Sequence, residues 1–404
     1  MSSAAASPYR SIGEVTDLLL ELGRALHEAG APAHRIEDTM GAVARAAGIE
    51  AQIVSQPTLL MCSFGEGEQA RTRVQRVSPT EYDLARLMAV DDVLEKAAVG
   101  KISPKEAVLE LRTLKHRRYP RWTIPVAYLA LGTTVAILVG GSVYDATAAA
   151  LISTLIGLVS LGRWRTPHLL NLTSAILASV AGALVNRAFG GSPANIALAS
   201  LIVLVPGLTL TQGLVELATR HLVSGTSRLM AALIVFLELG FGVALGQQIV
   251  EVTMGPAVPI AEAALPAWSG FFMVLPATLA LVVFFNAPLK RTLVIVTSVY
   301  LGFVGARLGS AWLGPLLGAG LGSFLIGAFA NVYARTFREP ASLALVPAVL
   351  LLVPGSIGYR SLESFIAADT TQAINAVFAT FVIATSIVSG ILVANTAIAP
   401  RRLL

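Results

Sequence analysis

The chain has 404 residues, of which 55% are hydrophobic and 13% are charged, and its mean hydropathy is +0.73. This composition is typical of a membrane protein and excludes a chain that is soluble throughout. The first 121 residues hold 16 basic and 16 acidic side chains, as a soluble domain would, so the net charge of +5 falls in residues 122–404. That excess argues for membrane orientation and against nucleic-acid binding. The single cysteine, Cys62, excludes an internal disulfide and fits a reducing cytosolic face.

Residues 1–121 predict a cytosolic α+β domain that ends in a basic linker. Apolar residues recur at helical spacing up to Gly30-Ala31-Pro32, which stops the first helix. Ser103-Pro104 opens a later helix, with Ser103 as N-cap and Glu106 as its capping-box partner. The N-terminus lacks a basic segment followed by an apolar one, so no cleaved signal peptide is expected. The expected elements are helices over 9–29, 33–47, about 78–99 and from 103 onward, and extended runs over 50–56, 58–64 and 71–77.

Residues 122–404 predict a transmembrane transport domain. Ten apolar segments with short connections follow the linker, and most are long enough to cross ~30 Å of hydrocarbon. If the basic run over 112–118 is cytoplasmic, alternate loops place ten basic residues inside and three outside, so both termini are predicted to be cytoplasmic. The segments are 123–140, 143–161, 168–188, 193–219, 228–248, 269–286, 291–308, 312–332, 340–366 and 371–395. The inside residues are Arg163, Arg165, Arg220, Arg228, Lys290, Arg291, Arg335, Arg338, Arg401 and Arg402, and the outside residues are Arg187, Arg307 and Arg360.

The segments divide into two groups of five, with halves over 122–267 and 268–404. Trp122 and Trp268 open the halves 146 residues apart, and the two Val-Pro-Gly sequences, centred on Pro206 and Pro354, are 148 residues apart. An odd number of crossings in each copy makes the second copy begin on the opposite side of the membrane. The expected fold is therefore membrane all-α, with ten transmembrane helices as a 5+5 inverted repeat behind the N-terminal cytosolic α+β domain.

The two Val-Pro-Gly sequences predict a substrate site. Proline near the middle of a long apolar segment interrupts a helix, and paired interrupted helices mark the binding site in many transporters. The half-helix after each break presents free N–H groups and a positive dipole end, which suit a substrate carboxylate. The alternative is a structural kink whose hydroxyls satisfy freed carbonyls. The candidate substrate-binding residues are Pro206, Gly207, Thr209, Thr211 and Gln212 at the first break, and Pro354, Gly355, Ser356, Tyr359 and Arg360 at the second.

Two acidic residues in apolar segments are candidates for proton coupling. Glu238 lies near the centre of the segment over 228–248, where a carboxylate is costly and by default functional. Glu216 lies nearer the cytoplasmic end of its segment and is expected at the interface. A carboxyl that is hydrogen-bonded between helices and serves only packing is the alternative for Glu238. The glycines of the spans, such as Gly318 and Gly327, are expected to allow close helix packing rather than to bind a ligand.

The N-terminal domain carries a Gly-x-x-x-His-Arg-x-Glu sequence at Gly30, His34, Arg35 and Glu37. Together with Gln56-Pro57-Thr58, the basic linker and the ten spans with their Val-Pro-Gly sequences, it resembles the threonine/serine exporter (ThrE) family along nearly the whole chain. The resemblance implies export of small hydroxy amino acids across the cytoplasmic membrane of bacteria, driven by the proton-motive force. Some relatives divide the two parts between separate polypeptides and look like dicarboxylate exporters.

The sequence therefore predicts a multi-pass secondary exporter of threonine or serine, coupled to protons, in the bacterial cytoplasmic membrane. A small dicarboxylate exporter, a membrane-anchored enzyme with its active site in residues 9–115, and an uncoupled channel or sensor are the alternatives. Against the enzyme, the N-terminal domain shows no nucleophile motif and no metal-ligand spacing, so a regulatory or gating role is expected there. The expected partners are the substrate, protons and the lipid bilayer, without cofactor, metal or nucleic acid. A homo-oligomer is compatible with the sequence.

Overall fold

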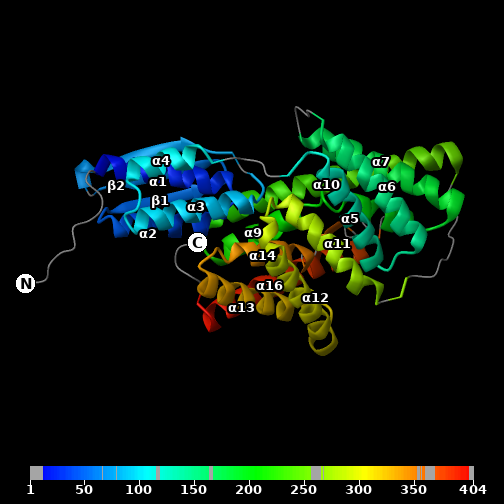
Figure 1. Cartoon of the computed structure of the whole chain (residues 1–404). Helices are drawn as coiled ribbons and strands as arrows, with labels where there is room; N and C mark the ends of the chain where they lie inside the picture. Colours follow the sequence, from blue (N-terminus) through cyan, green and yellow to red (C-terminus); the bar gives the residue numbers. More distant parts are fainter. Residues whose placement is uncertain are drawn as a thin grey trace, which may run out of the picture.

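The computed structural model describes residues 12–65, 67–78, 80–114, 119–162, 167–255, 265–266, 268–352, 355, 357–359 and 369–399. Two parts follow each other along the molecule (Figure 1). We call residues 12–114 the N-terminal unit, which is blue to cyan in the figure, and residues 119–399 the helical part, which continues to red.

The N-terminal unit is a small α+β fold with its own hydrophobic core. Three antiparallel strands lie in the order β1-β2-β3, with Ile53 opposite Cys62 and Cys62 opposite Arg73. Alternate residues of the middle strand, Leu60 and Phe64 among them, are buried against the helices, whereas the third strand is mostly exposed. The elements are α1 (Ile12–Glu28), α2 (Ala33–Ala46), β1 (Ala51–Gln56), β2 (Leu59–Phe64), η1 (Gly67–Gln69), β3 (Arg71–Arg76), α3 (Leu84–Ala98) and α4 (Pro104–Arg112).

The first residues of α4 and α3 test where the sequence predicted these helices to begin. The capping box at the start of α4 is confirmed, because the Glu106 carboxylate accepts from Ser103 N at 2.7 Å and Glu106 N donates to Ser103 Oγ at 3.3 Å. The predicted start of α3 at Ser78-Pro79 is wrong. The helix begins at Leu84, because Asp83 caps it by accepting from Arg86 N at 2.9 Å.

The chain before α3 instead runs alongside Gly30. Gly30 has φ +77°, and a Cβ added there would lie 2.7 Å from the carbonyl carbon of Glu81. Asp83 N then donates to Ala29 O at 3.1 Å. These tertiary contacts hold residues 80–83 outside a helix, and only a glycine combines the left-handed backbone with such close approach.

The helical part consists of long apolar helices that coincide broadly with the ten predicted segments. Several boundaries differ, two of them at helix starts. The predicted segment over 228–248 is a 33-residue helix that begins six residues earlier, and the one over 312–332 is shifted because Gly314, with φ +85°, ends the preceding helix. The elements are α5 (Thr123–Leu138), α6 (Val143–Ser160), α7 (Pro167–Phe189), α8 (Pro193–Leu201), α9 (Gly207–Ala218), α10 (Leu222–Met254), α11 (Ser269–Phe284), η2 (Leu289–Arg291), α12 (Thr292–Leu313), α13 (Gly318–Phe337), α14 (Ser342–Leu352) and α16 (Thr370–Ala397).

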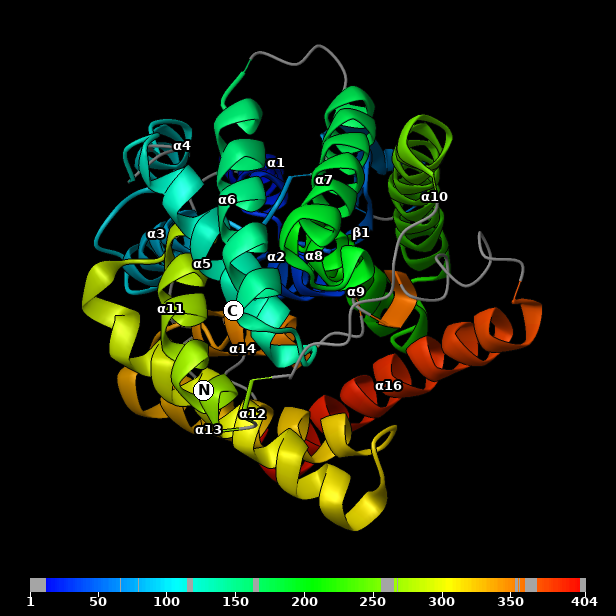
Figure 2. The ribbon, with the colours of Figure 1, turned by 90° about the vertical axis from the view of Figure 1, so that its right-hand side faces the viewer.

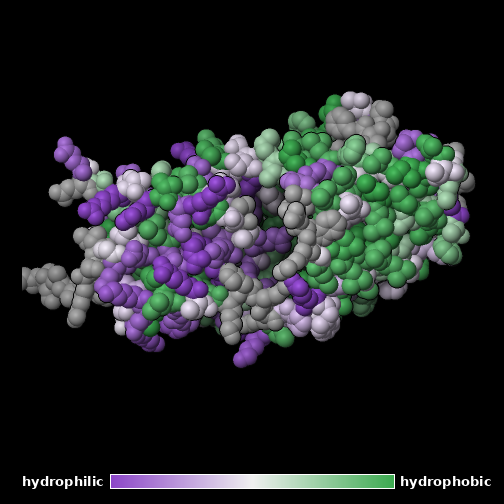
Figure 3. All heavy atoms as spheres, turned by 90° about the horizontal axis from the view of Figure 1, so that it is seen from above, coloured by the Kyte–Doolittle hydropathy of each residue, from purple (hydrophilic) through white to green (hydrophobic). Residues whose placement is uncertain are grey.

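Six helices among the described residues are long and apolar enough to cross a membrane. They cover 143–160, 168–189, 222–254, 289–313, 342–359 and 370–397, and α5 and α11 are shorter apolar helices. The surface agrees, since hydrophilic residues gather over the N-terminal unit and hydrophobic residues cover a broad face of the helical part (Figure 3). The exposed large hydrophobic side chains of the helical part include Leu151, Phe241, Val252, Leu293 and Phe378. Such a surface fits contact with lipid.

Small residues bring the helices close together. A Cβ on Gly242 of α10 would lie 2.6 Å from the Ala175 side chain of α7, and one on Gly327 of α13 would lie 2.8 Å from the Ala394 side chain of α16. The close-packing role expected for the glycines of the spans therefore agrees with the structure. Figure 2 shows α6, α7 and α10 standing side by side at one end of the molecule.

Candidate functional site

The first Val-Pro-Gly sequence breaks a helix, as predicted. Helix α8 ends at Leu201, and α9 begins at Gly207 with Pro206 as its N-cap. Between them Leu204 N and Val205 N both bond to Leu201 O, at 2.8 and 3.2 Å, and Gly207 N donates to Val205 O at 2.8 Å. The turn therefore satisfies most of its own backbone groups, as irregular backbone inside an apolar bundle must.

The glycine of the second Val-Pro-Gly sequence lies against the first break. Helix α14 covers Ser342–Leu352 and the backbone is helical at Gly355 and 357–359, whereas the predicted break at 353–354 lies outside the described residues. A Cβ on Gly355 would lie 3.7 Å from Cα of Gly207 and 3.0 Å from the Val205 side chain. Two glycines that are 148 residues apart in the sequence thus lie in contact.

The side chains at the breaks are placed in different ways. Thr211 is buried and donates to Gly207 O at 3.2 Å, whereas Thr209 is only partly buried. Tyr359 is 1% exposed and belongs to an apolar cluster with Phe236 of α10 and Val205. Pro354, Ser356 and Arg360 lie outside the described residues. The structure therefore brings Gly207, Gly355, Thr211 and Tyr359 to one region.

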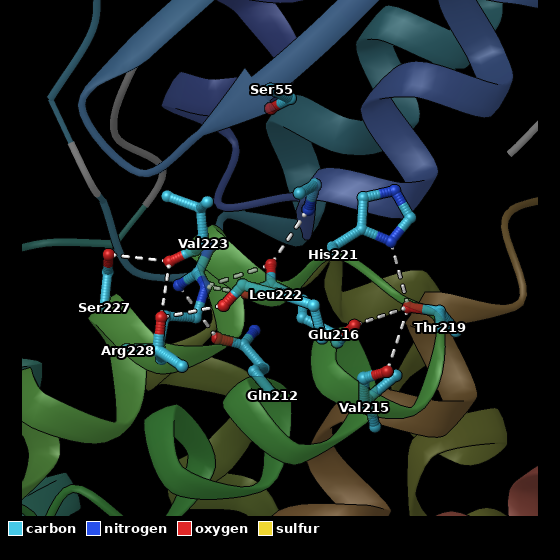
Figure 4. Close-up of polar contacts among 12 residues, drawn as sticks. Ser55, Gln212, Val215, Glu216, Thr219, His221, Leu222, Val223, Ser227 and Arg228 are labelled. Carbon is cyan, nitrogen blue, oxygen red and sulfur yellow. Dashed lines mark hydrogen bonds and ion pairs between the residues drawn. The ribbon is translucent and has the colours of Figure 1, made fainter.

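Gln212 and Glu216 of α9 point away from the break toward the N-terminal unit (Figure 4). Arg228 of α10 donates from Nε to both Glu216 oxygens, at 3.0 and 3.1 Å, and from Nη1 to Gln212 Oε1 at 3.2 Å. The same Glu216 carboxylate accepts from Ala33 N, the first residue of α2, at 3.0 Å. Because Pro32, the N-cap of α2, offers no side-chain cap, Glu216 caps that helix from another part of the chain.

A second set of contacts runs beside the first. His221 Nε2 and Glu37 Oε2 are 3.0 Å apart, and the other oxygen of Glu37 accepts from Ser55 N at 2.8 Å. Ser55 Oγ in turn lies 3.0 Å from His27 Nε2. Thr219 Oγ1 lies 3.1 Å from His221 Nδ1, which fixes the imidazole from the side of α9. Glu37 of the predicted motif therefore joins α2 to the turn between α9 and α10.

Among the other motif residues, Gly30 is buried and His34 and Arg35 are partly buried at this junction. Burial lowers the pKa of His34 to about 3, and the positive charges of Arg35 and Arg228 act in the same direction. Its Nδ1 has no hydrogen-bond partner among the described residues. Burial also lowers the pKa of Arg35, although Tyr82 and Asp38 oppose the shift. The rings of His34 and His221 lie 6.1 Å apart. The motif thus faces the helical part rather than a pocket inside the N-terminal unit.

Glu238 lies beside the start of α7. Its carboxylate contacts His168 Nδ1 and accepts from Asn171 Nδ2 at 2.9 Å, and both partners belong to the first two turns of α7. His168 is exposed. Glu238 is the midpoint of the 33-residue α10, so the middle of α10 packs beside the first turns of α7.

Three other features of the N-terminal unit bear on the enzyme alternative. Cys62 is buried in the core, and burial raises the pKa of its thiol to about 11. In the described part of the chain no three His, Cys, Asp or Glu side chains lie close enough to hold a metal ion. The polar convergence of this unit is instead the surface that contacts α9 and α10.

Sequence reasoning missed Arg228 and His221 as residues of this contact. They were visible only as a loop charge and a histidine between two apolar segments. The signal that could have found Arg228 is its opposite charge 12 residues from Glu216, across the turn between α9 and α10.

The fold and surface define a multi-pass membrane protein, and the comparison with protein families narrows this class. A family model described as "Putative threonine/serine exporter" matches residues 17–250, and one described as "Threonine/Serine exporter, ThrE" matches residues 270–397. The first match alone covers more than half of the chain. The chain therefore belongs to the threonine/serine exporter family of membrane transporters.

Several fungal proteins are similar to this chain. Pheromone-regulated membrane protein 10 of Eremothecium gossypii is 27% identical over 382 residues, which are 89% of this chain and 51% of that protein. The protein of the same name from Saccharomyces cerevisiae is 26% identical over 363 residues, with 85% and 46% covered. An uncharacterized protein of Schizosaccharomyces pombe is 27% identical over 360 residues, with 84% and 47% covered. The chain spans about half the length of these curated relatives, and no solved structure matches it.

Proposed function

We propose that this chain is a secondary active exporter of threonine and serine, driven by protons, which binds its substrate where the two helix breaks meet. The observation that carries the proposal is the contact between the breaks, since a Cβ on Gly355 would lie 3.7 Å from Cα of Gly207. Paired interrupted helices that meet within the bundle supply free helix ends to a small zwitterion. Membership of the exporter family supports the class of activity.

The proposal includes a ten-helix membrane domain of two inverted five-helix halves. Matching pairs of helices support it: α7 packs on α8 and α10 as α13 packs on α14 and α16, and α6 packs on α8 as α12 packs on α14. In both halves the third and fifth helices are parallel, because contacts advance together along α7 and α10 and along α13 and α16. The halves differ at their first two helices. In the first half α5 packs closely on α6, whereas in the second half α11 packs less closely on α12 and the close contact is between α12 and α13.

The N-terminal unit and both termini are assigned to the cytoplasmic side. The turn between α9 and α10 and the turn between α11 and α12 carry Arg220, Lys290 and Arg291, and both were predicted to be inside. The N-terminal unit contacts these same turns, through Glu37 to His221 and through Asp83 to Asn286 Nδ2 at 2.9 Å. The bacterial cytoplasmic membrane is the location that the family resemblance implies, whereas the relatives reported above are yeast proteins.

Proton coupling is assigned to Glu238 together with His168. A carboxylate and an imidazole in contact, where the start of α7 packs on the middle of α10, can take up and release a proton. Glu216 is assigned to the contact between the two parts of the molecule, because an arginine and a helix N-terminus already occupy both of its oxygens.

Efflux from proteoliposomes tests the activity. Vesicles holding the full chain are loaded with radiolabelled threonine, serine or succinate and followed with and without a pH gradient. The expected result is gradient-dependent efflux of threonine and serine and no efflux of succinate. Efflux of succinate alone would replace the proposal with the dicarboxylate exporter, and efflux that ignores the gradient would replace it with a channel.

Glu238→Gln tests the coupling residue. This variant should lose gradient-driven efflux and keep part of the counterflow exchange of threonine, because exchange requires no net proton movement. Glu251→Gln is the matched control, since Glu251 is an exposed acid on the same helix. Normal gradient-driven efflux in Glu238→Gln would make Glu238 a packing residue.

A further inference from the structure

A cavity of about 280 Å³ lies between the N-terminal unit and the adjoining ends of the helices. It is separate from the contact between the two breaks, and none of the residues predicted as site residues lines it. Its walls come from the segment before α3, the segment that leads into α5, and the ends of α6 and α11. Its lining includes Glu81, Tyr82, Tyr119, Thr123, Tyr128, Ser160, Phe284 and Asn286.

Glu81 is the acid of this cavity that is not already bonded. No hydrogen bond or ion pair joins the Glu81 carboxylate to another described residue, whereas Asp83 beside it caps α3 and accepts from Asn286. Glu81 lines the cavity and its side chain is exposed, while the protein around it raises the pKa of its carboxyl. Its carboxylate is therefore accessible to a ligand in the cavity.

Four aromatic residues also line the cavity. Tyr128 and Phe284 lie with ring centroids 5.4 Å apart and form one wall. The hydroxyl of Tyr119 donates to Ala287 O at 2.6 Å. This side chain therefore presents mainly its ring to the cavity. A carboxylate among aromatic rings is the combination that binds organic ammonium groups, through an ion pair and cation–π attraction.

We propose that this cavity is a binding site for a primary ammonium compound of amino-acid size, with Glu81 as its anion. The negative charge of Glu81 would repel an anion. A bare metal ion would need several oxygen ligands, whereas the cavity offers one free carboxylate. The first turn of α5, which includes Thr123, also lines the cavity, and the positive end of that helix favours the carboxylate of an amino acid.

In a threonine/serine exporter this cavity is the cytoplasmic access site for the substrate, an assignment that rests on the function proposed above. Tyr82 connects the cavity to the first break. It lines the cavity and hydrogen-bonds the Gln212 side chain of α9, the half-helix that follows that break. A ligand that displaces Tyr82 would therefore act directly on the helix that carries the break.

The charge of the cavity can be measured with thiol reagents in the full chain. Cys62→Ser removes the single native thiol, and Ser160→Cys introduces one on the cavity wall. We compare its rates of modification by cationic 2-aminoethyl, anionic 2-sulfonatoethyl and neutral methyl methanethiosulfonate. The expected result is a preference for the cation over the anion that falls about tenfold in Glu81→Gln and is unchanged in Glu68→Gln, which alters an exposed acid of the same unit.

Ligands then compete with the reagents. Ethanolamine, serine and threonine should slow the modification with Glu81 present and lose this effect in Glu81→Gln, whereas succinate should have none. A second thiol, introduced by Thr123→Cys, gives the same reading from another wall. Equal rates for cation and anion, no effect of Glu81→Gln, or no reaction of either thiol with the neutral reagent would overturn the proposal.

The outcome is separable from that of the transport assay. Threonine efflux with an unchanged charge preference in Glu81→Gln would retain the exporter and discard this site. Protection by ethanolamine without any threonine efflux would retain an ammonium site and discard the exporter.

Discussion

Glu216 is one of the residues that join the N-terminal unit to the helical part. Its side chain is fully buried and binds an arginine of α10 and the N-terminus of α2 at once. Two hydrogen-bonded partners offset the cost of removing the charge from water. A residue expected at the membrane interface is therefore part of a contact between the N-terminal unit and the half-helix that follows the first break.

Arg228→Ala should weaken that contact. Removal of one partner of a buried ion pair costs roughly 3–5 kcal/mol, because the other charge is left uncompensated. After specific cleavage at a protease site inserted within 115–118, the two parts should separate on size exclusion in this variant and stay together in the unsubstituted chain. Glu216→Gln combined with Arg228→Gln, which leaves no buried charge, should restore part of the association. Equal association in Arg228→Ala would show that the ion pair is not what joins the parts.

The buried histidines predict how stability depends on pH. Burial lowers the pKa of His27 to about 4 and that of His34 to about 3, from 6.5. The unfolded chain therefore takes up protons first as pH falls below about 6.5, and each histidine removes up to ~1.4 kcal/mol of stability per pH unit down to its folded pKa. The Tm of His27→Gln should fall less than that of the unsubstituted chain between pH 6.5 and 4.5, and the two profiles should run parallel above pH 7. Parallel profiles throughout would contradict the assignment.

At the scale of elements, the contact between the two breaks is the most informative feature. The first break satisfies its backbone locally, and Gly207 and Gly355 allow the two Val-Pro-Gly sequences to approach closely. Two small residues at one contact leave no side chain between the helix ends, which is where a small ligand can approach the backbone.

Gly355→Leu should therefore block transport without unfolding the protein. A Cβ there already lies 3.0 Å from the Val205 side chain, so a larger side chain would separate the breaks. Threonine efflux should fall by about tenfold or more, equivalent to ~1.4 kcal/mol of lost binding, and Gly207→Leu should act alike. Gly13→Leu is the control, since a Cβ at Gly13 meets nothing within 4 Å. Normal efflux in both variants would move the substrate site away from the breaks.

At the scale of the whole molecule, orientation in the membrane is the property to test. Reporter fusions after Arg165, Thr226 and Arg338 should report the cytoplasm, and a fusion near Pro259 should report the outside, because basic loop residues are retained on the cytoplasmic side. An outside signal after Arg338 would break the five-plus-five arrangement. Thr226 lies within α10, close to the contact with the N-terminal unit, so a cytoplasmic signal there also supports the side assigned to that unit.

Local rules predicted most of the secondary structure. The capping box at Ser103, the stop at Gly30 and the break at Pro206 each depend on residues within one turn, and each is found. The start of α3 was wrong because residues 80–83 make tertiary contacts instead of helical ones. The site was predictable in part, since both breaks could be located in the sequence, but the partners of Gln212 and Glu216 could not.

Composition, periodicity and loop charge thus determined the class of protein, the helices and the place where one of them breaks, because these follow from chain-local hydropathy and backbone chemistry. Only the tertiary structure decided that Gly207 and Gly355 lie in contact, that Glu238 lies beside the start of α7, and that Arg228, Glu216 and Ala33 meet. These pairings join residues 12 to 183 positions apart. Which residues pair depends on how the packed helices align, and hydropathy along the chain carries no information about that alignment.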